Sequence, residues 1–295
     1  MAPVGTVENT PKPLTPRGPA ARRVGVCTWS LHPGSLDGLL ASVRATGLST
    51  VHLGLEPLRT GVIAPDAAAR ELAAAGMTIA SGALAFPSED YSTLETIRHT
   101  GGVAPDDAWP EILAASETCA DIARTVGIPL VTFHAGWLPH DPHDPRRAVL
   151  LERIREVARR FVEQGIGVAL ETGQETADTL LELLGDLGDL RVGVNFDPAN
   201  MILYGMGDPI VALERLAPHV RQLHLKDALP AVRPGEWGTE VPAGEGAVDW
   251  AAFFRILEAR LPGVNVMIER EAGTQRVEDI RQAAGLAAHY LGGLG

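Results

Sequence analysis

The sequence contains only two cysteines, Cys27 and Cys119, among its 295 residues. Each lies in an apolar run, so the sequence predicts buried, reduced thiols rather than a disulfide, which is typical of a cytoplasmic protein. No apolar stretch approaches the roughly 20 residues that a membrane-spanning helix requires, and we expect no membrane association. Basic residues are outnumbered by acidic ones, 25 to 37, which gives a net charge of −12. This balance argues against nucleic acid as a partner, because phosphate neutralisation requires a basic surface.

A GxGxxG fingerprint is also missing after every predicted strand, so a dinucleotide-binding open sheet has no support. The first 22 residues are rich in proline, threonine, glycine and alanine, without periodicity and without the apolar segment of a signal peptide. We therefore expect a disordered tail over residues 1–22 and one folded domain over residues 23–295. Arg22 and Arg23 suggest twin-arginine export, but the segment that follows is too short and too strand-like for that interpretation.

From Val24 onward, short β-type runs alternate with longer helical patterns. The predicted strands cover residues 24–30, 50–55, 77–86, 129–135, 166–172, 191–197, 219–226 and 264–271. The predicted helices include residues 36–46, 66–75, 109–126, 145–164, 176–187, 209–217, 250–260 and 276–291. Strands that alternate with helices predict a parallel sheet. Eight such units predict a single-domain (β/α)8 TIM barrel.

The alternation within the strands places an apolar face toward the helices and a polar face toward the barrel interior. The polar parity ends in an acidic residue or a histidine on four consecutive predicted strands, at Glu171, Asp197, His224 and Glu269. Because TIM barrels place their active sites at the carboxyl ends of the strands, we expect these four side chains to converge. For Asp197 alone, the competing interpretation is a simple turn before Pro198.

Three carboxylates and one imidazole in a barrel mouth repel one another unless a cation or protons compensate. Oxygen ligands with one histidine suit a single divalent ion, with Mn2+ or Co2+ favoured and Mg2+ or Zn2+ as alternatives. The competing interpretation is a set of buried salt bridges. Few basic residues share the interior parity, and Lys226 is the main exception.

Five motifs carry a resemblance to a known family. They are LET ending at Thr172, NFDPAN at 195–200, QLHLKDA at 222–228, PAGEGAVDW at 242–250 and MIERE at 267–271. From Val24 to its end, the chain resembles the sugar phosphate isomerase/epimerase superfamily, which has a xylose isomerase-like TIM barrel. The resemblance implies that Glu171, Asp197, His224 and Glu269 are the metal ligands. It also implies that Glu171 and Glu269 act as acid and base in the enolisation of a sugar or sugar phosphate.

Four further residues are predicted substrate contacts: His134, Asn200, Lys226 and Glu245. His134 ends the fourth predicted strand, where a core histidine bonded to a neighbour is the alternative. Lys226 is suited to an oxyanion or a substrate phosphate, unless it pairs with Asp227 or Glu269. Glu245 lies in a loop that members of the family carry before the seventh helix.

Other polar residues have simpler interpretations. Asp249 is predicted to cap the helix that begins at Trp250, and the loop at 137–145 is predicted to form turns and a cap rather than a second metal site. Trp29, Trp137 and Trp237 are candidates for the walls of a sugar pocket, with hydrophobic cover as the alternative.

The chain also departs from its relatives. Asn200 stands where many epimerases have a histidine, and no D-x-H follows the seventh predicted strand. These departures argue against an endonuclease IV-like nuclease, which needs additional histidines. The absence of an arginine shortly after His224 argues against a free-ketose C3 epimerase.

The leading hypothesis is therefore a cytoplasmic, metal-dependent sugar isomerase or epimerase. The alternative is a metal-dependent dehydratase or lyase that acts on a keto-sugar or inosose. A non-catalytic sugar-binding barrel is a third hypothesis, from a different class. The sequence leaves open the substrate, its phosphorylation and whether the protein is a homo-oligomer.

Overall fold

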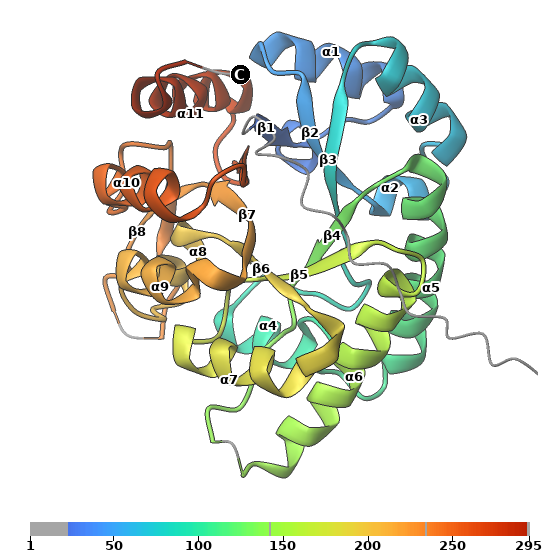
Figure 1. The fold of residues 1–295 in the computed structure, drawn as a ribbon, viewed down its shortest axis with the longest axis vertical. Helices are drawn as coiled ribbons and strands as arrows, with labels where there is room; N and C mark the ends of the chain where they lie inside the picture. Colours follow the sequence, from blue (N-terminus) through green and yellow to red (C-terminus); the bar gives the residue numbers. More distant parts are fainter. Residues whose placement is uncertain (1–22, 142, 234, 294–295) are drawn as a thin grey trace, which may run out of the picture.

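The computed structural model describes residues 23–141, 143–233 and 235–293, so the predicted tail at 1–22 lies outside the described residues. Eight parallel strands close into a barrel in the order β1-β10-β7-β6-β5-β4-β3-β2 (Figure 1). Their bounds are β1 Val24–Cys27, β2 Thr50–Gly54, β3 Thr78–Ala83, β4 Leu130–Phe133, β5 Gly167–Glu171, β6 Gly193–Phe196, β7 Val220–Leu225 and β10 Asn265–Ile268. The predicted (β/α)8 TIM barrel is confirmed.

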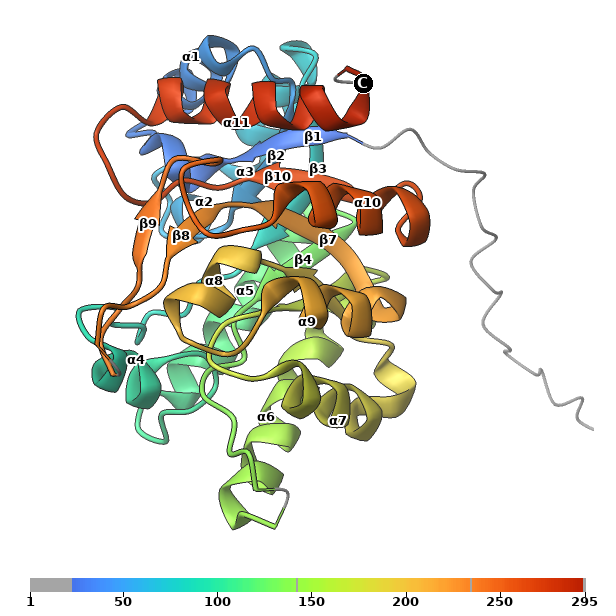
Figure 2. The same cartoon turned by 90° about the vertical axis from the view of Figure 1, so that its left-hand side faces the viewer.

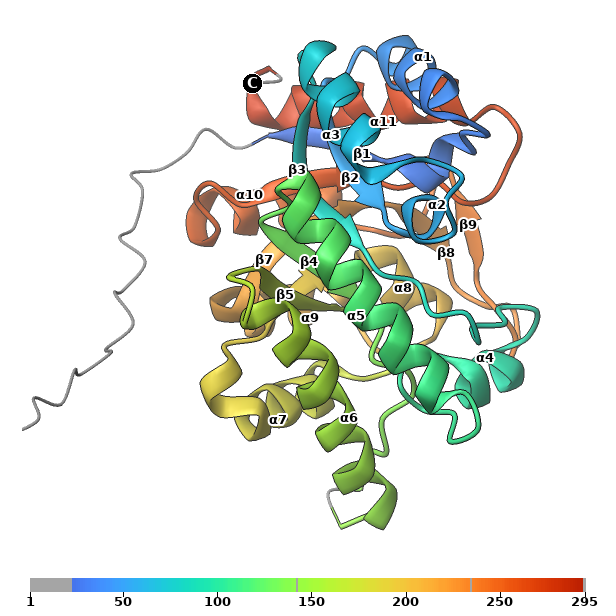
Figure 3. The ribbon, with the colours of Figure 1, turned by 90° about the vertical axis from the view of Figure 1, so that its right-hand side faces the viewer.

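Helices surround the barrel (Figure 1). Their bounds are α1 Leu36–Thr46, α2 Glu56–Arg59, α3 Pro65–Ala74, α4 Leu94–Thr100, α5 Trp109–Val126, α6 Pro145–Val162, α7 Ala177–Leu187, α8 Pro198–Leu203, α9 Pro209–Leu216, α10 Trp250–Arg260 and α11 Arg276–Leu291. Figure 3 shows α3, α5 and α6 following one another around the outside. Gly47 and Gly127 end α1 and α5 in the left-handed conformation that glycine adopts without strain. Within the described residues, no helix combines the length and apolar character that a bilayer span requires.

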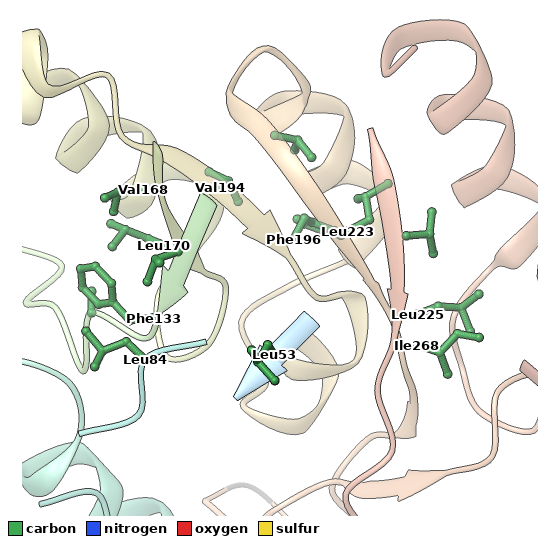
Figure 4. Close-up of a cluster of buried hydrophobic side chains, with 14 of the residues drawn as sticks. Leu53, Leu84, Phe133, Val168, Leu170, Val194, Phe196, Leu223, Leu225 and Ile268 are labelled. Carbon is green, nitrogen blue, oxygen red and sulfur yellow. The ribbon is translucent and has the colours of Figure 1, made fainter. Parts of the chain in front are cut away.

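The main core lies between the strands and the helices, as the apolar parity predicts. Figure 4 shows this cluster, which includes Leu53, Phe133, Val168, Leu170, Val194, Phe196, Leu223, Leu225 and Ile268. All of these side chains are buried. Cys27 and Cys119 are buried and free, in agreement with the sequence.

The structure corrects the first predicted strand. It ends at Cys27, and residues Thr28–Leu31 form a 3-10 helix. The hydroxyl groups in this turn have partners outside β1. Thr28 Oγ1 accepts from the backbone of Gly54 at 2.8 Å, and Ser30 Oγ accepts from the backbone of Arg270 at 2.9 Å. These contacts tie the turn to the ends of β2 and β10.

Between the predicted strand at 219–226 and the predicted helix at 250–260, the structure contains an additional strand pair. β8 (Asp227–Leu229) pairs with β9 (Thr239–Val241) in antiparallel register. Figure 2 shows this hairpin projecting beside α8. Three-residue strands are too short to produce a readable alternation, which explains why the pattern missed them.

Candidate metal centre

The structure brings the four predicted ligands together at the carboxyl ends of β5, β6, β7 and β10, which are adjacent in the barrel. All four residues are buried, and one ligand atom from each lies within 4.8 Å of all the others. They are Glu171, Asp197, His224 and Glu269. Three carboxylates and an imidazole thus share one small, buried volume.

His224 Nδ1 is the centre of this cluster. It lies 3.3 Å from Glu171 Oε1, 3.4 Å from Asp197 Oδ2 and 3.2 Å from Glu269 Oε2. Nevertheless, neither His224 Nδ1 nor Asp197 Oδ2 has a hydrogen-bond partner within the described part of the chain. Buried polar atoms without partners are costly, and a cation between these atoms satisfies both of them. The donor set therefore fits a divalent metal ion.

The two oxygens of Asp197 have different partners. Oδ1 accepts from the backbone N–H groups of Ala199 and Asn200 and so caps the first turn of α8. Oδ2 faces the cluster. Thr172 fixes the backbone, because its hydroxyl donates to the carbonyl of Asp197 and accepts from its N–H. The turn interpretation and the ligand interpretation of Asp197 therefore describe two halves of one carboxylate.

Glu171 is held by amide groups. Asn195 Nδ2 donates to its Oε2 at 2.9 Å, and Asn200 Nδ2 donates to its Oε1 at 3.2 Å. His134 Nε2 lies 3.5 Å from the same Oε1. Asn195 was not selected from the sequence, although it shares the interior parity with Asp197, and that parity is the signal by which it could have been found.

Glu269 is held by two donors of a different kind. Trp29 Nε1 donates to its Oε1 at 2.6 Å, and Lys226 Nζ donates to its Oε2 at 2.9 Å. Lys226 also contacts Glu271 Oε2 at 2.5 Å and Asn200 Oδ1 at 3.3 Å. The pairing of Lys226 with Glu269 that the sequence left open is therefore present, and Lys226 neutralises part of the charge of the cluster.

The electrostatics of the site follow from these neighbours. Burial raises the pKa of Glu171, but the nearby His224 and His134 together outweigh this effect, and the pKa falls from 4.5 to about 2. Burial also raises the pKa of Glu269, but the nearby Lys226 acts in the opposite direction, and this pKa lies well below its usual range. Burial raises the pKa of Asp197 and is only partly offset by Lys226. Burial lowers the pKa of His224, but the surrounding carboxylates raise it well above 6.5. A proton on His224 therefore balances part of the negative charge, and a divalent ion binds in competition with that proton.

A polar layer beneath the cluster orients the imidazole of His224. Its Nε2 lies 3.3 Å from His52 Nδ1, 3.7 Å from Cys27 Sγ and 3.0 Å from Asn195 Nδ2. Burial lowers the pKa of His52 to about 3, so His52 is neutral. These contacts fix the ring with Nδ1 toward the carboxylates, as is usual for the neighbours of a metal-binding histidine.

A cavity of about 700 Å³ opens above the cluster. Three of the predicted substrate contacts line it, namely His134, Asn200 and Lys226. Glu245 does not line it. Its side chain is exposed and accepts a hydrogen bond from Gln282 Nε2 on α11.

Of the three tryptophans predicted as candidate pocket walls, two line the cavity and one does not. Trp29 and Trp237 line the cavity. Trp137 instead packs against Arg98, whose guanidinium lies 4.0 Å from the ring centroid. Outside the cavity, Asp249 caps α10 and Asp144 caps α6, as the sequence predicts.

Comparisons with known proteins agree with this geometry. Residues 40–289 match the model of a family described as xylose isomerase-like TIM barrel. The structure of a xylose isomerase domain protein from Planctomyces limnophilus shares 32% sequence identity with the chain, at a TM-score of 0.81 over 92% of this chain and 99% of that one. No curated protein sequence matches the chain.

Two further solved structures share the fold at lower identity. An L-ribulose 3-epimerase has 16% identity and a TM-score of 0.70, over 92% of this chain and 95% of that one. A xylose isomerase-like TIM barrel protein from Mycobacterium smegmatis, solved in complex with magnesium, has 16% identity and a TM-score of 0.66, over 92% and 98% of the two chains.

Proposed function

Because the chain belongs to the xylose isomerase-like TIM barrel family, we propose that it is a divalent-metal-dependent isomerase or epimerase that enolises a sugar or sugar phosphate. One observation carries the proposal. Three carboxylates and an imidazole converge in the barrel mouth, and two of their buried atoms, Asp197 Oδ2 and His224 Nδ1, lack partners among the described residues.

Glu171, Asp197, His224 and Glu269 would hold the metal ion. When bound, a divalent ion polarises a substrate carbonyl or hydroxyl group and stabilises the negative charge that develops on it. The oxygen-rich donor set favours Mn2+ or Co2+, with Mg2+ and Zn2+ as alternatives.

Glu171 and Glu269 are the proposed proton carriers. Their strands, β5 and β10, are separated in the barrel by β6 and β7, so the two carboxylates enter the mouth from different sides. Their lowered pKa values keep both ionised at neutral pH, which allows either to accept a proton from a carbon next to a carbonyl. Return of that proton by the same carboxylate to the neighbouring carbon moves the carbonyl. Inversion of a centre instead requires that the opposite carboxylate be protonated at the start and deliver its own proton to the other face.

The remaining contacts orient the carboxylates and the substrate. Asn195 and Asn200 hold Glu171, while Trp29 holds Glu269. Lys226 is suited to donate to a substrate oxygen, because its ammonium group lines the cavity beside Glu269. His134 is a second donor, on the side of Glu171.

The test combines metal analysis with substitution. We expect one divalent ion per chain, thermal stabilisation by Mn2+ or Co2+, and loss of that stabilisation in Asp197→Asn. Glu171→Gln and Glu269→Gln should each slow the exchange of substrate protons with D2O by at least a factor of about 100. This exchange is followed by NMR over a panel of sugars and keto-sugars. The matched control is Glu258→Gln, on the exposed outer face of α10.

The outcomes separate the hypotheses. Activity of either glutamine variant within tenfold of the unmodified protein removes that residue from catalysis. Loss of water or of an aglycone from the substrate replaces the isomerase by the dehydratase or lyase. A protein that neither binds nor responds to any divalent ion contradicts the proposal and leaves the non-catalytic barrel.

A further inference from the structure

Six carboxylates and several aromatic rings line the cavity above the cluster. Its carboxylates are Glu56, Glu89, Glu171, Glu240, Glu269 and Glu271. Lys226 is its one lysine, and no arginine lines it within the described residues. Lys226 is already paired with Glu269 and Glu271. Apart from the proposed metal ion, the described lining therefore offers a phosphate ester no cationic side chain that is free of a carboxylate partner, since His134 lies beside Glu171.

The position after the eighth barrel strand is the one at which TIM barrels commonly bind phosphate, through free backbone N–H groups. In this chain those groups follow β10. The N–H groups of Glu271 and Ala272 donate to the carboxylate of Glu240, at 2.9 and 3.2 Å. Arg270 Nη1 donates to the same carboxylate at 2.7 Å. The carboxylate of Glu240, on β9, thus occupies the position that a bound anion would take.

The loop after the seventh barrel strand is satisfied in the same manner. The carboxylate of Asp227 accepts from the backbone N–H groups of Gly244, Gly246 and Val248 at 2.8, 3.1 and 3.2 Å. Both loops that form phosphate sites in this fold therefore direct N–H groups at internal carboxylates. A phosphate group that used these N–H groups would have to displace a carboxylate from each set.

Aromatic rings provide the uncharged part of the cavity. Trp29, Tyr91, Tyr204 and Trp237 line it, and the rings of Tyr204 and Trp237 meet edge to face with centroids 4.8 Å apart. Such rings combine an apolar face with a polar edge, which suits a sugar ring with both C–H faces and hydroxyl groups.

We infer that the substrate is an uncharged, unphosphorylated carbohydrate, an inference that rests on the proposed function. Recognition uses the aromatic walls, the carboxylates as acceptors for hydroxyl groups, and Lys226. Glu240 and Asp227 disfavour phosphate esters, because their carboxylates already occupy backbone N–H groups of the loops that follow β10 and β7.

The first arm of the test compares each neutral sugar with its own phosphate ester on the metal-loaded protein. D-Fructose with D-fructose 6-phosphate and D-ribulose with D-ribulose 5-phosphate are two such pairs, with binding followed by calorimetry and turnover by NMR. We expect the neutral member to bind at least tenfold more tightly. A phosphate ester that binds or turns over as well as its neutral partner overturns the inference and leaves the proposed function intact.

The second arm does not depend on the choice of sugar. Glu240→Ala frees the N–H groups of Glu271 and Ala272 together with Arg270, and we expect inorganic phosphate to bind this variant at least tenfold more tightly than the unmodified protein. Glu240→Gln removes the charge but retains an acceptor, and should fall between the two. Phosphate binding by the unmodified protein as tight as that of Glu240→Ala contradicts the inference. If no sugar of either form binds, the proposed function fails, and phosphate binding still tests the role of Glu240.

Discussion

Asp227 connects two of the sequence motifs that identify this family. Its replacement by asparagine tests how much this connection contributes to the stability of the protein. The carboxylate accepts five hydrogen bonds. Oδ1 accepts from the N–H groups of Ala228 and Val248, and Oδ2 accepts from those of Gly244 and Gly246 and from the indole of Trp250, all between 2.8 and 3.2 Å. Asp227→Asn keeps the shape of the side chain but turns one acceptor into a donor.

The cost follows from the count of donors on each side. The less unfavourable orientation directs the new amide group at the two donors of Oδ1, so at least two charge-assisted hydrogen bonds are lost. Each contributes about 1.5–3 kcal/mol, which gives a loss of about 3–6 kcal/mol. Because part of the glycine-rich loop is exposed to water, we expect a loss near the lower end of this range. Against a total stability of about 5–15 kcal/mol, this is a large fraction.

The assay is urea unfolding of the metal-free protein, followed by circular dichroism. We expect Asp227→Asn to lower the free energy of unfolding by about 3 kcal/mol and to speed amide hydrogen exchange at Gly244, Gly246 and Val248. Asp249→Asn is the matched control, since asparagine and aspartate cap helices equally well, and it should change stability by less than about 0.5 kcal/mol. A loss below about 1 kcal/mol for Asp227→Asn would refute the assignment of this carboxylate as the anchor of the loop.

Three further predictions concern stability. Burial raises the pKa of Glu175 from 4.5 to about 7, so the folded protein holds this proton more tightly than the unfolded chain does. The free energy of unfolding is therefore not reduced by Glu175 below pH 4.5, and it falls as the pH rises from there through 7. Glu175→Gln should therefore match the unmodified protein at pH 4.5 and exceed it by up to about 3 kcal/mol at pH 8, and a difference that does not vary with pH in urea unfolding contradicts this. Gly285→Ala, in an open position of α11, should stabilise the protein by about 0.5–1 kcal/mol. Gly102→Ala should instead lower the melting temperature, because φ is +59° and the added Cβ would lie 2.2 Å from the carbonyl carbon of Ala135.

The sequence was sufficient for the barrel and for the residues that converge in its mouth. Both follow from periodicity, because a strand with one face toward the helices must alternate, and the four residues share the phase that this alternation assigns to the interior. Asp197 shows the limit of such reasoning. Parity places the residue, but only the structure shows that Oδ1 caps α8 while Oδ2 faces the cluster.

The remainder of the site depends on contacts between segments far apart in the chain. The bond from Trp29 to Glu269 joins residues 240 positions apart, and no local pattern encodes it. Glu240 lies on a three-residue strand, outside the strands that the pattern predicted. Glu245 shows the reverse case, since its motif suggested a role in substrate binding while the chain directs it toward Gln282 on α11.

The burial of Lys226 has a practical consequence for chemical labelling. The sequence has two lysines, Lys12 and Lys226, and Lys226 is the one within the described residues. Its side chain is 3% exposed, and its ammonium group is paired with Glu269 and Glu271. Amine-directed reagents therefore meet a single lysine in the described part of the barrel, and they react with it only when it leaves its ion pairs with Glu269 and Glu271. The rate at which Lys226 is modified therefore reports how often these ion pairs break.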